Sequence, residues 1–222
     1  MIHPRELFLN AALAAIAWTP SLSQSNPQSM PRFGVIAGAN LATISGGYFQ
    51  KASNRTGFAG GLMAVLPVAT RFAIQPELIF TMKGANSDSG GFSARAKMYY
   101  VELPVLMRFE IPASGRVKSF VYGGPGFAYR TSCTLEGQAP GLDITVSCDQ
   151  QARQGELASP GVKYRRTDVD GIIGGGLAFD IGGRTTTVGV RYDVGFVNFF
   201  NCNTSKNRVL SFMGTLEWPF RK

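Results

Sequence analysis

The chain has 222 residues, 27 of them glycine, and a formal net charge of +8 at pH 7. Charged residues make up 16% of the chain, below the roughly 25% of typical soluble domains, which favours an outer face in contact with lipid. The basic residues form no run, so the charge does not point to nucleic acid. Outer-membrane lipid and the phosphates of lipopolysaccharide are the partners that fit this charge.

Histidine and cysteine usage excludes several kinds of site. His3 is the only histidine, and it lies in a segment that we expect to be removed. Histidine-based acid–base chemistry, catalytic triads and metal ligation are therefore excluded from the mature chain. The cysteines are Cys133, Cys148 and Cys202, with no Cys-x-x-Cys and no zinc spacing. We expect no cofactor and no metal.

Residues 1–23 have the pattern of a secretory signal peptide. Arg5 precedes an apolar stretch at 7–18, and Ser21 and Ser23 are small residues that permit cleavage before Gln24. The apolar stretch is too short to span a bilayer core of roughly 30 Å as a helix. Residues 24–32 form a polar periplasmic lead-in, and 33–222 form the folded domain.

Two segments, 72–83 and 98–110, alternate strictly between apolar and polar side chains, which predicts strands. A soluble barrel or sandwich would turn the apolar side chains inward, whereas a membrane barrel turns them outward to lipid. The same kind of reading along the chain predicts eight strands, at 33–42, 57–66, 72–83, 98–110, 119–130, 168–180, 185–196 and 208–220.

The connections between these strands alternate in length. Long ones fall at 43–56, 84–97, 131–167 and 197–207, and short ones at 67–71, 111–118 and 181–184. Outer-membrane barrels have short periplasmic turns and longer extracellular loops. The expected fold is therefore all-β, an eight-stranded antiparallel up-and-down transmembrane β-barrel in the outer membrane of a Gram-negative bacterium.

The last strand ends in aromatic residues that lie on the same face, including Trp218 and Phe220. Both suit the membrane interface, where a ring lies between lipid and water. Such a strand resembles the signal read by the outer-membrane assembly machinery. Pro76, Pro104 and Pro125 fall inside strands, and we expect bulges or widened pairs there because proline cannot donate to the ladder.

Several motifs follow one another in a recognisable order: IQPELIF at 74–80, YYVELPVLMRF at 99–109, YGGPGFAYR at 122–130 and GIIGGGLAF at 171–179. This order is similar to the PorT-like outer-membrane β-barrel family of small eight-stranded barrels, over most of the mature chain. The resemblance implies the barrel fold and the strand prolines, but no catalytic motif. The long third loop with its cysteines departs from the family pattern, so no specific role is carried over.

If the polar parity faces the lumen, seven charged residues lie inside: Glu77, Glu102, Arg108, Asp170, Arg191, Asp193 and Glu217. An eight-stranded barrel is just wide enough for its side chains to fill it, and buried charges must be paired. We expect Arg108 and Arg191 to bridge Glu77 and Glu102 as a structural network. The alternatives are an acid–base pair of carboxylates and a narrow ion path.

Cys133 and Cys148 are expected to form a disulfide in an oxidising compartment, which leaves Cys202 over. Loop 131–167 is the expected place for a protein partner. The sequence predicts a non-enzymatic barrel with a structural or surface-interaction role. The alternatives are a small-solute or ion channel, an accessory component of a secretion system, and a soluble periplasmic ligand-binding barrel with the apolar parity inside.

Overall fold

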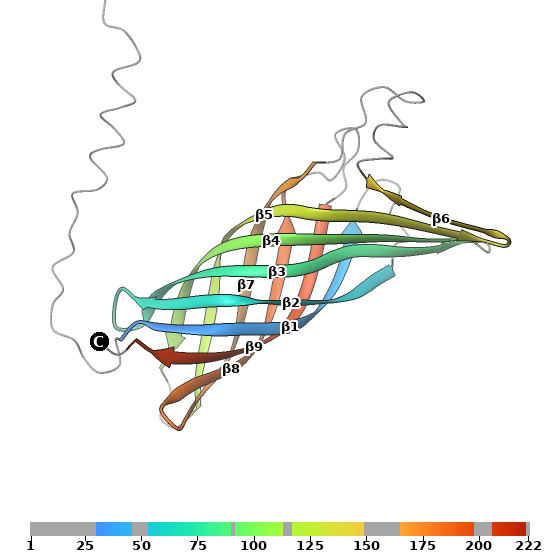
Figure 1. Ribbon diagram of the computed structural model, residues 1–222. Helices are drawn as coiled ribbons and strands as arrows, with labels where there is room; N and C mark the ends of the chain where they lie inside the picture. Colours follow the sequence, from blue (N-terminus) through green and yellow to red (C-terminus); the bar gives the residue numbers. More distant parts are fainter. Residues whose placement is uncertain are drawn as a thin grey trace, which may run out of the picture.

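The computed structural model describes residues 30–45, 53–89, 92–112, 117–148, 165–197 and 206–220. Nine strands form in these residues, and they are drawn in Figure 1. Their bounds are β1 Arg32–Ser45, β2 Ser53–Pro67, β3 Phe72–Ser89, β4 Phe92–Ile111, β5 Val117–Ala139, β6 Leu142–Ser147, β7 Thr167–Ile181, β8 Arg184–Gly195 and β9 Lys206–Pro219. The described residues contain no helix long and apolar enough to cross a membrane. The predicted signal peptide, 1–23, lies outside the described residues.

Eight of these strands close into a barrel. Their order is β4-β3-β2-β1-β9-β8-β7-β5, each pair is antiparallel, and a pairing between β4 and β5 closes the ring. The ninth strand, β6, pairs with β5 outside the ring. The expected eight-stranded antiparallel barrel is confirmed, and Figure 1 shows it with β6 beyond one end.

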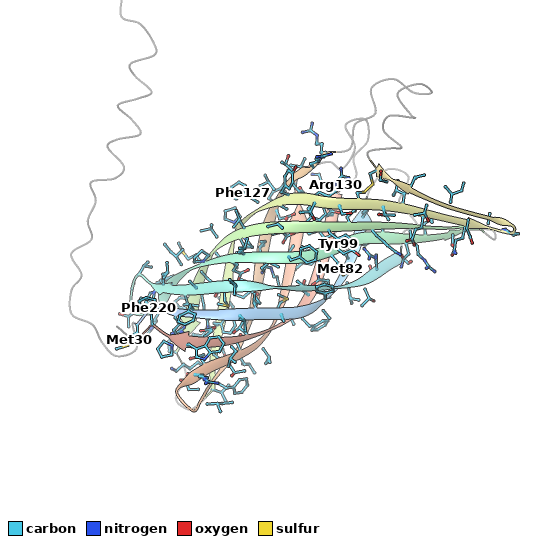
Figure 2. All side chains as sticks on the ribbon, viewed as in Figure 1. Met30, Met82, Tyr99, Phe127, Arg130 and Phe220 are labelled. Carbon is cyan, nitrogen blue, oxygen red and sulfur yellow. A yellow bond between two sulfur atoms is a disulfide. The ribbon has the colours of Figure 1, made fainter. Side chains whose placement is uncertain are left out.

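Apolar side chains face outward along every barrel strand. Leu78, Leu103 and Met107 are 47%, 53% and 60% exposed, whereas the neighbouring Glu77 and Arg108 are 4% and 1% exposed. Figure 2 marks Met82, Tyr99 and Phe127 on the outer wall. The alternative of a soluble barrel with an apolar interior is therefore wrong, because the period-two pattern is turned the other way.

Two long connections are corrected by the structure. Residues 84–89 continue β3 and residues 92–97 begin β4, with Ser87 opposite Ala94, and the region 131–167 contains the end of β5 and all of β6. Beyond the lipid both faces of a strand meet water, and in the outer part of β3, at 84–89, apolar and polar residues no longer alternate. The alternation that revealed the other strands therefore ends before β3 does.

The three strand prolines do not lie at bulges. The pairing keeps the same register on both sides of Pro76, Pro104 and Pro125, although pairs are missing beside each of them. The shifts in register occur instead between Asn54 and Ala59 and at Tyr99–Tyr100. Of the two alternatives expected at the prolines, bulges are not found, and the missing pairs agree with widened pairs: the ladder skips a donor that proline lacks and continues in the same register.

Glycine permits close approach at two luminal positions. A Cβ on Gly61 would run into the carbonyl oxygen of Leu78 on β3, and one on Gly174 would lie 2.7 Å from the ring of Tyr122. Gly61 thus lets two strands curve together, and Gly174 leaves the space that the Tyr122 ring fills.

Candidate functional site

At the end with the short turns, the lumen holds one group of ion pairs. Arg108 Nη1 lies 3.2 Å from Glu217 Oε1, and Arg32 Nε lies 2.8 Å from Glu217 Oε2. Arg32 also reaches Glu110 Oε1 at 3.2 Å. The guanidinium of Arg108 lies 4.0 Å from the centre of the Phe120 ring, which covers it on one side. Four strands are tied together here, β1, β4, β5 and β9.

A second group lies in the middle of the barrel. Arg191 Nη1 is 2.6 Å from Glu77 Oε2, and its Nε is 2.9 Å from Asp193 Oδ1. Gln75 Nε2 donates to the other oxygen of Glu77 at 2.6 Å. Arg191 and Glu77 come from β8 and β3, which are not neighbours in the wall, so the pair crosses the lumen.

A third group lies toward the opposite end. Lys83 Nζ is 2.6 Å from Glu102 Oε1 and 3.1 Å from Asp170 Oδ2. Nearby on β9, Asn207 Nδ2 donates to Asp168 Oδ2 at 3.0 Å. Lys83, Glu102 and Asp170 are all at most 3% exposed, so their charges depend on one another rather than on water.

The structure places all seven residues of the predicted network in the lumen. One part of the prediction is wrong: neither arginine pairs with Glu102, which contacts Lys83 instead. Lys83 was missed because 83 was read as the end of a strand, although it shares the parity of Glu77. Glu110 and Arg130 were missed for the same reason, since each is the last residue of an expected strand. Arg32 and Asn207 were missed because each lies one residue outside an expected strand.

A small cavity lies in the lumen among these groups. It has a volume of about 10 Å³, which is room for about one water molecule. It is lined by Gln75 and Arg108 together with Ile36, Phe120, Tyr122, Thr187, Gly189, Met213 and Thr215. Among the described residues no group of three or more Asp, Glu, His or Cys side chains is placed to hold a metal ion.

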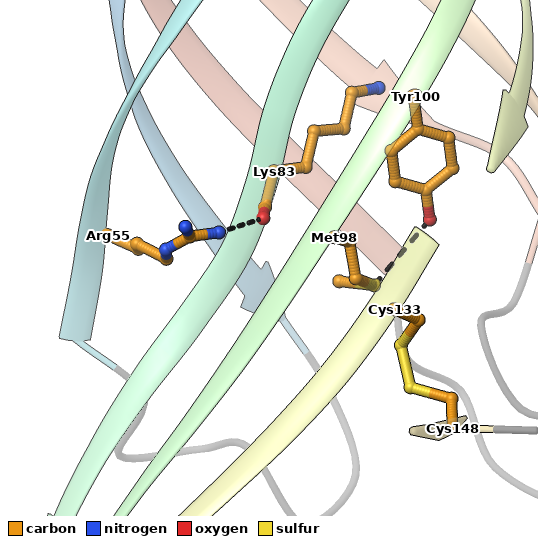
Figure 3. Close-up of a disulfide and its surroundings, with 6 residues drawn as sticks. All are labelled: Arg55, Lys83, Met98, Tyr100, Cys133 and Cys148. Atoms are coloured by element: carbon orange, nitrogen blue, oxygen red, sulfur yellow. Dashed lines mark hydrogen bonds between the residues drawn. A yellow bond between two sulfur atoms is a disulfide. The ribbon is translucent and has the colours of Figure 1, made fainter. Parts of the chain in front are cut away.

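An apolar cluster, called the plug below, lies next to Lys83, whose Nζ is 5.3 Å from the centre of the Tyr100 ring. Cys133 and Cys148 form the predicted disulfide, with their Cα atoms 5.5 Å apart. Figure 3 shows it beside Met98 and Tyr100, and the Tyr100 hydroxyl donates to Met98 Sδ at 3.6 Å. The plug is completed by Ile44, Ala85 and Ala128. Cys202 lies outside the described residues, so the structure does not test its pairing.

Beyond this plug, β3, β4, β5 and β6 continue as a projecting sheet. It is formed by residues 86–89, 92–97, 134–139 and 142–147, and Figure 1 shows it reaching past the other strands. β6 is its last strand and pairs with β5 alone among the described strands. One edge of the sheet therefore presents backbone groups without a strand partner.

The opposite end of the wall carries an aromatic cluster. Phe33 stacks on Trp218 with ring centres 5.9 Å apart, and Phe220 meets Phe33 edge-on at 6.3 Å. The guanidinium of Arg184 lies 5.8 Å from the centre of the Trp218 ring. A ring between apolar neighbours and a charged group suits a membrane interface, and the placement of Trp218 and Phe220 there stays a prediction.

Comparison with known protein families decides what kind of barrel this is. The family described as outer membrane protein beta-barrel domain matches residues 22–201, which is most of the chain. The chain belongs to this family. Its members are barrels of the bacterial outer membrane, so the outer membrane is where this protein resides. The match supports the family at this level and does not extend to the narrower PorT-like group.

Solved structures resemble the barrel at low sequence identity. Neisserial surface protein A is 14% identical, with a TM-score of 0.47, over 85% of this chain and 97% of that one. Ail from Yersinia pestis is 11% identical, with a TM-score of 0.43, over 85% and 99%. OprG from Pseudomonas aeruginosa is 10% identical, with a TM-score of 0.45, over 87% and 98%. No curated protein matches the chain.

Proposed function

We propose that this outer-membrane barrel is a surface-interaction protein that binds an extended polypeptide at the free edge of β6. The observation that carries the proposal is the projecting sheet, whose last strand has one unpaired edge among the described strands. A peptide that adds a strand to such an edge gains main-chain hydrogen bonds along its length. The edge lies within 131–167, the loop in which the sequence predicts a partner.

The register of β6 shows which backbone groups are available. Ala139 and Leu142 face each other across a two-residue turn, Pro140-Gly141, so alternate residues of β6 bond to β5. Asp143 and Thr145 are the residues between them, and their N–H and C=O groups point away from β5. β6 has a single charged side chain, Asp143, so little charge opposes an incoming strand.

A proline at position 145 tests this edge directly. Thr145→Pro removes an N–H that points outward and leaves the bonds to β5 in place, because proline is tolerated at an edge. Peptides of twelve random residues, displayed on phage, would be selected on the purified wild type. We expect the enriched peptides to bind Thr145→Pro at least about tenfold more weakly, a loss of one or two hydrogen bonds. The measurement is peptide affinity by biolayer interferometry.

Thr145→Ala is the matched control, because it removes the side chain and keeps the N–H. It should bind the selected peptides as the wild type does. Equal binding to the proline variant and the wild type would show that the edge of β6 is not the recognition surface. A loss of binding in the alanine variant alone would assign recognition to the threonine hydroxyl instead.

We propose a structural role for the lumen. Glu77 and Glu102 each have a buried cationic partner and are at most 4% exposed, which supports a barrel without catalytic activity, since a substrate would have to displace that partner. The small cavity and the plug next to Lys83 likewise favour a filled lumen over the alternative of a channel.

Folded wild-type protein in a planar bilayer is therefore expected to give no conductance above background. The physical reason is that an ion would have to break the Arg191–Glu77 pair, which crosses the lumen. The control is Arg191→Ala measured in parallel. A steady conductance of the wild type that changes in the variant would contradict the filled lumen and establish an ion path lined by these charges.

The finer placement in the PorT-like group, and with it an accessory part in a secretion system, is also a proposal. It is supported by the Gln-Pro-Glu-Leu at 75–78 and the Glu-Leu-Pro at 102–104. The aromatic end of β9, with Trp218 followed by Phe220, supports recognition by the assembly machinery of the outer membrane.

A further inference from the structure

The outer wall changes from apolar to basic near the extracellular start of β9. Phe212 and Leu210 face outward, and Arg208 and Lys206 follow on the same face. The two cations are about 7 Å apart along the strand, since each residue of a strand adds 3.3 Å. Arg208 is exposed and Lys206 is partly exposed, so both charges are available to a ligand.

Among the residues that the structure describes, no side chain neutralises this pair. Arg208 lies opposite Thr43 of β1 and Val194 of β8, which are uncharged. The nearby carboxylates, Asp193 of the neighbouring β8 and Asp168 of β7, are buried in the lumen, 5% and 6% exposed. Within the residues that the structure describes, neither Lys206 nor Arg208 forms an ion pair.

The corresponding position on the other side of the barrel differs in this respect. Lys97 is the first cation beyond the outward-facing Tyr99 on β4, as Arg208 is beyond Leu210 on β9. Lys97 forms an ion pair with Glu136 of β5. Both sites lie where the apolar wall ends on the extracellular side. Among the described residues, Lys97 has an acidic partner there, whereas Lys206 and Arg208 have none.

Aromatic side chains lie next to the open pair. Tyr192 of β8 is 37% exposed and pairs with Leu210, so it lies one step below Arg208 on the apolar wall. Phe196, 58% exposed, directly follows β8 at the level of Lys206, and its ring covers the outward face of Gly171, where a Cβ would lie 2.7 Å from it. Exposed aromatic rings at the end of an apolar wall mark the boundary between acyl chains and head groups. A ligand of the cations here has an apolar part beside Tyr192 and an anionic part at the level of Arg208 and Lys206.

We propose that Lys206 and Arg208 bind a phosphate of lipopolysaccharide, the phosphorylated lipid of the outer leaflet at this end of the barrel. The acyl chains pack against Tyr192 and the apolar wall below it, and the two cations hold the phosphate above Tyr192, with the Phe196 ring beside them. The site goes beyond the proposed function, because it lies on the lipid-facing wall and not on the projecting sheet. It gives the barrel a preferred annular lipid on the side formed by β8 and β9.

The test compares Lys206→Gln/Arg208→Gln with the wild type, as folded protein in a neutral detergent. The probes are purified deep-rough lipopolysaccharide, the same material after removal of its phosphates, and phosphatidylglycerol. Binding is measured by native mass spectrometry. Two cations near a lipid surface should together give about a 30-fold change in affinity. We expect the double variant to bind the phosphorylated lipopolysaccharide that much more weakly, and the wild type to bind the dephosphorylated form weakly.

Lys97→Gln is the control for lost charge at the same border and should bind as the wild type does. Arg208→Lys keeps the charge and should retain affinity within about threefold. Unchanged binding in the double variant, an equal loss in Lys97→Gln, or equal affinity of the wild type for phosphatidylglycerol would each overturn the proposal. Thr145→Pro should retain lipopolysaccharide binding, so failure of the peptide-binding function is distinguishable from failure of this site.

Discussion

Replacing Arg191 with alanine is expected to lower the free energy of unfolding of the barrel by about 3–5 kcal/mol. The substitution removes the partner of both Glu77 and Asp193, at 2.6 and 2.9 Å, and leaves two carboxylates in a lumen where they are 4% and 5% exposed. Breaking a buried pair costs more than the pair contributes, because a charge is left without water or partner. Urea unfolding in detergent, followed by tryptophan fluorescence, measures the change.

Two variants give this expectation its controls. Arg71→Ala removes an exposed cation from the turn between β2 and β3, and it should change stability by less than about 0.5 kcal/mol. Glu77→Gln/Arg191→Met removes one buried charge of each sign and should recover part of the loss. If the double variant were as unstable as the sum of its two single changes, the two side chains would act independently and the luminal pair would carry no coupling.

Removing the disulfide with Cys133→Ala/Cys148→Ala is expected to destabilise the β5–β6 hairpin by about 3 kcal/mol, while the closed ring keeps its strands. The bridge spans a sequence separation of 15 residues and fixes the end of β6 against the plug. Opening of the hairpin should therefore become about 100-fold more frequent. Limited proteolysis with detection of cleavage in 140–148 measures this, with the heat-modifiable migration of the barrel on gels as the record of an intact ring.

Reduced wild-type protein is the control, and it should be cleaved as rapidly as the variant. Equal resistance of the variant and the oxidised wild type would mean that β6 is held by its pairing with β5 alone. The same assay is informative for the proposed function, because a hairpin that opens freely presents no fixed edge to a peptide.

The sequence predicts the barrel wall well because lipid imposes a strong contrast on it. Along 72–83 and 98–110, every second residue is apolar and faces outward, and this alone predicts which side Glu77, Glu102 and Arg108 occupy. Strand number and the sorting of connections by length follow from the same contrast. Where the lipid ends, the contrast ends, so the outer part of β3, at 84–89, could not be found by alternation. β6 does alternate, but it is only six residues long and lies in a segment that the sequence predicts to be a loop.

The luminal pairing could be predicted only in part. The alternation along a strand identifies which charged side chains face inward. It does not say which of them meet across the lumen, because that depends on the position of each residue along the barrel axis. Glu102 meets Lys83, four residues further along β3 than Ile79, its partner in the wall. Lys83 itself looks like an interfacial lysine at a strand end, and only the continuation of β3 to Ser89 shows that it is buried.

The pairing of β1 with β9 determines when the barrel can form. The Arg32–Glu217 ion pair joins residues 185 positions apart, and the ladder beside it runs the length of both strands. Contacts this distant in sequence form slowly, because the entropy of closing the loop is lost before any contact compensates for it. Until β9 has been made and docked, the ring stays open and its charges stay in water. Acquisition of the native state is therefore post-translational, and the chain must be kept from aggregating until its last strand arrives.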